Sequence, residues 1–222
     1  MSENAQELQR IYQQRFSATS AYRNRVWQVL TASFFNRWIP AKGAVLDLGC
    51  GYGEFINHIA AREKYAMDLN PDAPQHLTPA VRFFEQDCSV PWPLADNDLD
   101  TVFTSNFFEH LPDKECLKRT LRQAFRCLKP GGRLIAMGPN IKFLPGQYWD
   151  FFDHHTILTE ASLSEVLEMA GFKLEQVTPR FLPYTLVNAP EYPLWLLRLY
   201  LMLPWLWRLK GRQFLVVATK PD

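Results

Sequence analysis

The sequence has few cysteines, almost no net charge and no long uninterrupted apolar run. Its four cysteines form no C-x-x-C pair and no zinc-type spacing, so we expect reduced thiols and no structural metal. A formal net charge of +1 gives no reason to expect nucleic acid as a partner. No apolar run reaches the roughly 20 residues of a membrane-spanning helix, and the first residues lack the pattern of a secretory signal. These absences favour a cytoplasmic protein.

The composition is that of an ordinary globular protein. Hydrophobic residues make up 47% of the 222 residues and charged residues 21%, which argues against disorder. This length allows one large α/β domain or two small ones. Aromatic residues are frequent, at 14%.

A glycine-rich turn follows the first predicted strand. The apolar run 44–48 predicts a buried strand, and the turn at 49–53 opens a helix. The spacing is G-x-G-x-G, and Glu54 stands where a dinucleotide fold would have its third glycine. Glu54 and Asp47 would repel a pyrophosphate. The turn therefore favours a ligand that carries positive charge and hydroxyl groups.

Further strands alternate with helices along the chain. Asp68 ends the second strand, where a carboxylate can accept hydrogen bonds from both hydroxyls of a ribose. Helices are predicted over 54–62 and 114–128, with the glycines of Lys-Pro-Gly-Gly ending the latter, and a third is capped at Thr159. Strands after the first are predicted at 65–69, 81–86, 99–106, 133–138, 172–178 and 213–219.

Three motifs carry a resemblance to a known family. They are Asp47-x-Gly49-x-Gly51-x-Gly53, the run from Asp87 through Asp100 to Glu109-His110-Leu111, and Leu-Lys-Pro-Gly-Gly-Arg-Leu at 128–134. Together they resemble class I S-adenosylmethionine-dependent methyltransferases. The resemblance implies one α/β domain over 1–222. It implies a Rossmann-like, seven-stranded, mostly parallel sheet with helices on both faces and an antiparallel last strand.

The resemblance also implies a site for S-adenosylmethionine. In the family the glycine turn passes under the methionine part, the residue at the Asp68 position binds the ribose, and residues at the Asp87 position bracket the adenine. The cofactor-binding residues expected from these matches are Asp47, Gly49, Cys50, Gly51, Gly53, Asp68, Leu69, Asp87, Cys88 and Asn106.

The N-terminal part is expected to cover the cofactor. Apolar residues at helical spacing predict a helix over 5–38, broken near 17–20, within a lid of residues 1–42. As part of a lid, Tyr22, Arg23 and Arg25 would meet the cofactor's carboxylate. The alternative is that they belong to a solvated helix face.

The segment after the fifth strand supplies candidates for acid–base chemistry. His154 or His155 is the candidate general base, with Asp150 or Asp153 orienting it. In the alternative, one histidine only holds the loop in place. A metal site built from these four residues is disfavoured, and His110 is expected to shape the pocket.

An insertion at 179–212 precedes the last strand. Leucines and tryptophans surround its predicted helix, which Pro204 breaks, and cations gather at its far end. Such a composition is typical of segments that lie in a membrane interface. Three interpretations stay open: a cap over an apolar substrate pocket, a peripheral membrane or lipid contact through 193–212, and a dimer interface.

The expected function is methyl transfer from S-adenosylmethionine to O, N or C of a small or lipid-linked acceptor. One alternative is a non-catalytic protein that binds the cofactor as a partner or regulatory subunit. Another is an NAD(P)-dependent oxidoreductase, which Glu54 disfavours.

Overall fold

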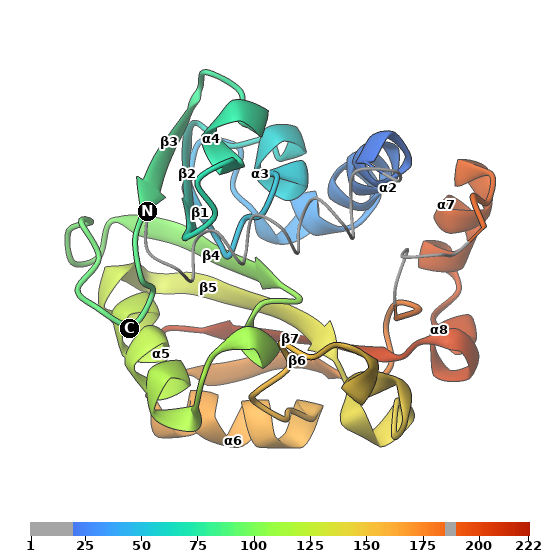
Figure 1. The fold of residues 1–222 in the computed structure, drawn as a ribbon. Helices are drawn as coiled ribbons and strands as arrows, with labels where there is room; N and C mark the ends of the chain where they lie inside the picture. The colour runs from blue at the N-terminus through green and yellow to red at the C-terminus, as the bar shows by residue number, and fades with distance from the viewer. Residues whose placement is uncertain (1–19, 185–189) are drawn as a thin grey trace. The chain divides into compact units, whose positions relative to one another are not determined.

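The computed structural model describes residues 20–184 and 190–222 (Figure 1). The part of the predicted N-terminal helix at 5–19 and residues 185–189 of the insertion lie outside the described residues. The chain divides into two compact units, the first formed by Met1–Asp87 with Thr185–Leu203 and the second by Cys88–Tyr184 with Pro204–Asp222. The strand order is β3-β2-β1-β4-β5-β7-β6, which confirms the predicted fold class.

The first unit contains parallel strands. β1 pairs with β2 and β2 pairs with β3, both parallel. Its strands are β1 (Ala44–Leu48), β2 (Glu63–Asp68) and β3 (Val81–Glu85), and its helices are α2 (Ser20–Ser33), α3 (Glu54–His58), α4 (Ala73–His76) and α7 (Leu194–Met202). Helix α3 is shorter than the helix predicted over 54–62, because the backbone of Ile59 is already extended.

Strand β1 lies at the centre of this unit's core. All five of its residues are buried, as expected for a parallel strand that is covered on both faces. Aromatic rings join helices α2 and α3, since Phe55 lies edge-on to both Trp27 and Phe35 with centroids 6.1 Å apart. This packing fixes α3 at the end of the glycine turn.

The second unit combines parallel and antiparallel strands. β4 and β5 are parallel, whereas β7 runs antiparallel to both β5 and β6, which confirms the predicted antiparallel last strand. Figure 1 shows α6 beside β6. The strands are β4 (Leu99–Ser105), β5 (Leu128–Pro139), β6 (Lys173–Thr178) and β7 (Gln213–Thr219), and the helices are α5 (Lys114–Cys127), α6 (Glu160–Met169) and α8 (Pro204–Lys210).

Helix α5 ends differently from the sequence prediction. Asp113 caps its start by accepting a hydrogen bond from the Cys116 backbone at 2.7 Å. The helix ends before Leu128, where the backbone becomes extended and β5 begins. The prediction that the glycines of Lys-Pro-Gly-Gly end the helix is wrong. They lie inside β5, where the pairing with β4 shifts register and Gly131 takes a φ of 73°.

Pro204 separates α7 from α8, as predicted. Both helices are short. Within residues 20–184 and 190–222, the structure contains no helix with the length and apolar character needed to cross a bilayer.

Candidate functional site

The glycine turn between β1 and α3 takes a backbone form that needs glycine. Gly49, Gly51 and Gly53 have φ values of 68°, 54° and 72°, in the left-handed region. A Cβ on Gly53 would lie 2.3 Å from Leu77 Cδ2, so α4 also limits this position. The turn is thus open to close approach by a ligand because no side chains project from these positions.

Asp68, at the end of β2, holds this turn. Its Oδ2 accepts a hydrogen bond from the Gly51 backbone at 2.7 Å, and its Oδ1 accepts one from Asn70 at 2.8 Å. Each carboxylate oxygen has a second lone pair that can accept another donor. The side chain therefore braces the turn, and its carboxylate is the type of acceptor that suits a hydroxyl group of a ligand.

Carboxylates surround the turn. Asp47 is only 3% exposed, and burial, followed by the charges of Glu54 and Asp68, raises its pKa well above the usual value. Glu54 forms an ion pair with Arg23 of α2 at 2.9 Å. Such an acidic turn fits a cationic ligand with hydroxyl groups, and it does not fit a pyrophosphate. It thus fits the cofactor that the sequence predicts.

Two further predicted cofactor residues in this unit differ in exposure. Leu69 follows Asp68 directly and leaves 42% of its surface exposed, so it offers an apolar contact for a flat ring. Cys50 is buried, and burial together with Asp68 and Asp47 raises the pKa of its thiol well above the usual value. Cys50 therefore remains a neutral thiol and is not a nucleophile.

The remaining predicted cofactor residues lie after β3 and β4. Asp87 is exposed at the end of the first unit. Cys88 is buried in the second unit, with its Sγ 3.2 Å from Thr120 Oγ1. Asn106 has a φ of 50°, and its backbone donates to Met137 at 2.8 Å. The contacts of Cys88 indicate packing, whereas Asn106 occupies a turn directly beyond the end of β4.

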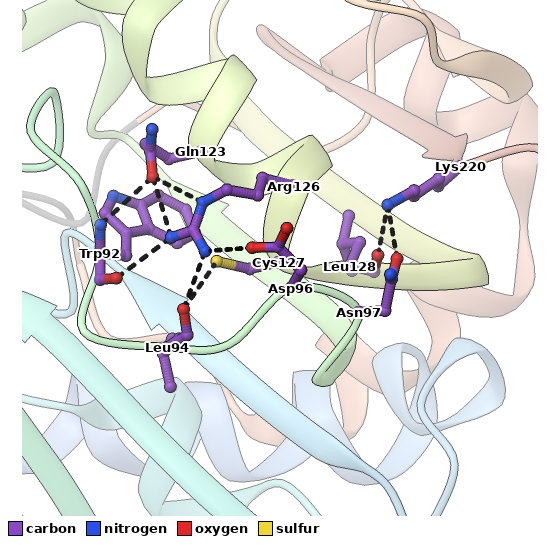
Figure 2. Close-up of polar contacts among 9 residues, drawn as sticks. All are labelled: Trp92, Leu94, Asp96, Asn97, Gln123, Arg126, Cys127, Leu128 and Lys220. Carbon is purple, nitrogen blue, oxygen red and sulfur yellow. Dashed lines mark hydrogen bonds and ion pairs between the residues drawn. The ribbon is translucent and has the colours of Figure 1, made fainter.

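The proline-rich loop before β4 is part of the scaffold. Figure 2 shows the Arg126 guanidinium reaching this loop from α5. It donates to the carbonyls of Trp92 and Leu94 at 3.1 and 3.0 Å and to Asp96 Oδ1 at 2.6 Å. Gln123 Oε1 receives a further bond from Arg126 at 3.0 Å. This part of the family motif therefore stabilises the fold rather than the ligand site.

A second cation holds the end of the same loop. Lys220 donates from Nζ to Asn97 Oδ1 at 2.7 Å and to the Leu128 carbonyl at 2.9 Å (Figure 2). Asn97 takes a φ of 57°, a form that asparagine tolerates better than most residues. The bond from Lys220 and the positive φ together explain why position 97 suits a compact, polar side chain.

The loop after β5 is tied to the turn after β4. The Glu109 carbonyl accepts hydrogen bonds from the backbones of His155 and Thr156 at 2.8 and 3.0 Å. The Thr156 hydroxyl donates to the Leu111 carbonyl at 2.7 Å, and the buried Tyr148 hydroxyl donates to Thr156 at 2.6 Å. These bonds bring His154 beside the Glu-His-Leu motif.

A cluster of ionisable groups results. One ligand-type atom from each of Glu109, His110 and His154 lies within 4.8 Å of the others. Burial raises the pKa of Glu109 to about 7, with Asp153 adding to the rise and His110 opposing it. Burial alone would lower the pKa of His110, but its hydrogen bond to Asp153 and the charge of Glu109 outweigh this and raise it. We call Glu109, His110 and His154 the Glu–His cluster.

The other two predicted residues of this loop do not belong to the cluster. His155 is exposed and reaches Glu109 through its backbone only, and Asp150 is also exposed. Glu109 was not among the site residues expected from the sequence. A signal was present, because a polar Glu-His pair directly after a buried strand falls at the edge of the sheet where ligands bind.

The first turns of helix α2 contact residues 191 and 192 of the insertion. The Tyr22 hydroxyl donates to the Tyr192 carbonyl and accepts from the Tyr192 backbone, both at 3.0 Å. Arg25 pairs with Glu191 at 3.3 Å. Of the three residues predicted to meet the cofactor's carboxylate, only Arg23 pairs with a residue of the glycine turn's helix, Glu54.

Comparison with known proteins identifies the family. The model of the family described as "Methyltransferase domain" matches residues 19–177. The chain belongs to this family. The matched range contains the glycine turn, Asp68 and the Glu–His cluster.

Similar proteins agree with this assignment. A "Probable S-adenosylmethionine-dependent methyltransferase" of Mycolicibacterium smegmatis is 34% identical over 139 residues, which are 59% of this chain and 52% of the relative. The chain thus spans about half the length of this curated relative. The resemblance to class I S-adenosylmethionine-dependent methyltransferases, with S-adenosylmethionine as the cofactor, is confirmed.

Solved structures support the fold. A chain in the complex between the Haloferax volcanii Trm112 methyltransferase activator and a methyltransferase is 20% identical, with a TM-score of 0.68 and coverage of 93% of this chain and 95% of that chain. A SAM-dependent methyltransferase from Archaeoglobus fulgidus is 19% identical, with a TM-score of 0.66 and coverage of 91% and 97%. At this identity the likeness concerns the fold alone.

Proposed function

We propose that the protein transfers a methyl group from S-adenosylmethionine to O, N or C of a small or lipid-linked acceptor. The acidic glycine turn carries this proposal. Its open backbone, the braced Asp68 carboxylate and the buried Asp47 suit a cationic nucleoside. When bound, S-adenosylmethionine supplies a methyl group that its positive sulfur has already activated.

The chain's own residues bind and align the reactants. Asp68 accepts the ribose hydroxyls, and the surrounding carboxylates favour a cation over the neutral thioether that remains after transfer. The bound cofactor would supply the methyl carbon to an electron pair of the acceptor, and its sulfur would keep the electrons of the broken carbon–sulfur bond. Alignment of two reactants can lower a barrier by about 7–11 kcal/mol.

A titration followed by a transfer assay tests the proposal. Calorimetry should show binding of S-adenosylmethionine and no comparable binding of NADH. Radiolabelled methyl donor, incubated with extract separated into lipid, glycan and small-metabolite pools, should then label one pool. Tight NADH binding without a response to S-adenosylmethionine would refute the proposal. Cofactor binding without labelling of any pool would indicate a non-catalytic binding protein.

We also propose that the insertion meets a lipid surface or a lipid-linked acceptor. In α7, Trp195 is 63% exposed and Met202 is 76% exposed. Residues 194–212 carry four cations and no acidic residue. Tryptophan and apolar side chains with nearby cations suit an anionic membrane interface.

Sedimentation with vesicles tests the membrane contact. The protein should bind vesicles with anionic lipid more strongly than zwitterionic ones, and added salt should weaken the binding. A Trp195→Ala, Met202→Ala variant should bind less, whereas Trp149→Ala, which changes an exposed tryptophan outside the insertion, serves as the control. Equal binding by both variants would contradict the proposed contact.

A further inference from the structure

We propose that Glu109, His110 and His154 bind Zn²⁺ or a related divalent transition-metal ion. This set of ligands differs from Asp150, Asp153, His154 and His155, at which a metal site was disfavoured from the sequence. The proposal concerns a site within the second unit. Only its catalytic role depends on the proposed methyl transfer, and its ability to bind metal does not.

The three side chains have the chemistry and spacing of metal ligands. A carboxylate and two imidazoles each present an atom within 4.8 Å of the others. Glu109 is 2% exposed and His154 is 7% exposed, so two of the three ligands lie in a site largely shielded from bulk water. Two histidines and a glutamate form the ligand set of several catalytic zinc sites, which leave one position for water or substrate.

His110 has the supporting partner that a metal-binding histidine needs. Its Nδ1 lies 3.0 Å from the Asp153 carbonyl and 3.2 Å from Asp153 Oδ2. A proton on Nδ1 can be shared with these acceptors, and this tautomer leaves the lone pair on Nε2 available to a metal. A carboxylate behind a histidine both fixes the ring and makes it a better ligand.

The surrounding structure holds the cluster in place. Two backbone hydrogen bonds join the Glu109 carbonyl to His155 and Thr156, directly after His154. Aromatic rings pack on His154, with Tyr148 at 4.7 Å and Phe151 stacked at 5.2 Å between centroids. Such a shell limits the entry of water and restrains the ring, so little reorganisation is needed to bind an ion.

The charge balance favours a cation. Glu109 and Asp153 bring two carboxylates to the cluster, and the charged groups that act on Glu109 are His110 and Asp153. A buried carboxylate is costly unless a positive charge compensates it, and a divalent ion would supply that charge in place of a protonated His110.

The ligand types indicate which metal would bind. Imidazole suits Zn²⁺ and related transition metals, whereas Mg²⁺ prefers oxygen ligands. The cluster follows β4, at the edge of a parallel pair where ligands bind. There an ion could take an acceptor oxygen as a further ligand and lower the pKa of its hydroxyl, whose proton would pass to water. His154 would then be a ligand and not a base.

Metal binding to the untagged full chain tests the site directly. Protein stripped with a chelator should bind one Zn²⁺ per chain in a competition titration, confirmed by elemental analysis of the dialysed protein. Loss of a supporting group typically costs 10–100-fold in affinity, so His110→Ala and His154→Ala should each weaken Zn²⁺ binding by about 100-fold or more. His155→Ala changes an exposed neighbour and should leave the affinity within about twofold, since it removes no ligand.

Other outcomes would overturn the site. The proposal is refuted if the wild-type chain binds no stoichiometric Zn²⁺, or if it binds Mg²⁺ as tightly as Zn²⁺. It is also refuted if His155→Ala loses as much Zn²⁺ affinity as the variants of the ligands. Circular dichroism checks that each variant folds. If His154→Ala does not fold, the partly exposed His110 still decides the question through His110→Ala. Titration of stripped protein with S-adenosylmethionine keeps the tests separate, because cofactor binding without metal binding overturns this site alone.

Discussion

Replacing Asp68 by asparagine would test the cofactor site at the two carboxylate oxygens that brace the glycine turn. Asparagine has nearly the same shape, but it loses the charge and turns one acceptor oxygen into a donor group. The Asp68 oxygens each accept a backbone N–H, from Gly51 and from Asn70. In the variant one of these N–H groups must therefore face the amide NH₂.

The expected loss of affinity follows from these bonds. A hydrogen bond to a charged group contributes about 1.5–3 kcal/mol. Loss of one such bond to the ribose would weaken S-adenosylmethionine binding by roughly 10–150-fold, since about 1.4 kcal/mol corresponds to a factor of ten. The unfavourable contact within the turn would also lower the free energy of unfolding by about 1–3 kcal/mol.

Calorimetric titration and chemical denaturation would measure the two effects on the same samples. Glu63→Gln is the matched control, because Glu63 begins strand β2 and so lies at the amino end of the strand, away from the carboxyl end where Asp68 lies and where ligands bind. The control should bind the cofactor like the wild type. Unchanged affinity in Asp68→Asn, in protein that remains folded at the assay temperature, would refute the ribose role of Asp68.

Three further predictions concern the second unit and the thiols. Arg126→Ala should lower the free energy of unfolding by about 2–4 kcal/mol, because the carbonyls of Trp92 and Leu94 lose a charged donor. The exposed Arg122→Ala should change it by less than about 0.5 kcal/mol in the same denaturation assay. Gly211→Ala should destabilise by about 1–3 kcal/mol, since its Cβ would lie 2.6 Å from the backbone of Arg180, whereas Gly146→Ala meets open space and should leave the unfolding midpoint nearly unchanged. All cysteines are buried, so a thiol reagent should label them at the rate of unfolding, and rapid labelling of the native protein would contradict their burial.

Much of the fold could be predicted because its signals are local. The predicted strand at 213–219 has the same bounds as β7, since an apolar run between polar ends defines it. The break at Pro204 follows from the missing N–H and fixed φ of proline. The acidic glycine turn was equally readable, because Asp47 and Glu54 lie within a few residues of the glycines.

Features that depend on long-range contacts could not be predicted in this way. Glu109 and His154 are far apart in the chain, and backbone bonds to His155 and Thr156 bring them together. The sequence shows that His154 and His155 are adjacent, but not which of them is buried. Likewise, Lys-Pro-Gly-Gly resembles a helix terminator locally, and only the pairing of β5 with β4 places it within a strand.

The double hydrogen bond between Tyr22 and the Tyr192 backbone has a consequence for engineering. One hydroxyl joins the helix near the start of the chain to the insertion near its end, so the two segments form a single exchangeable module. Because both bonds run to the backbone at position 192, a grafted insertion keeps them only where its chain follows the same path past Tyr22. Grafts of the insertion should therefore preserve the backbone path at Tyr192 or carry α2 along with them.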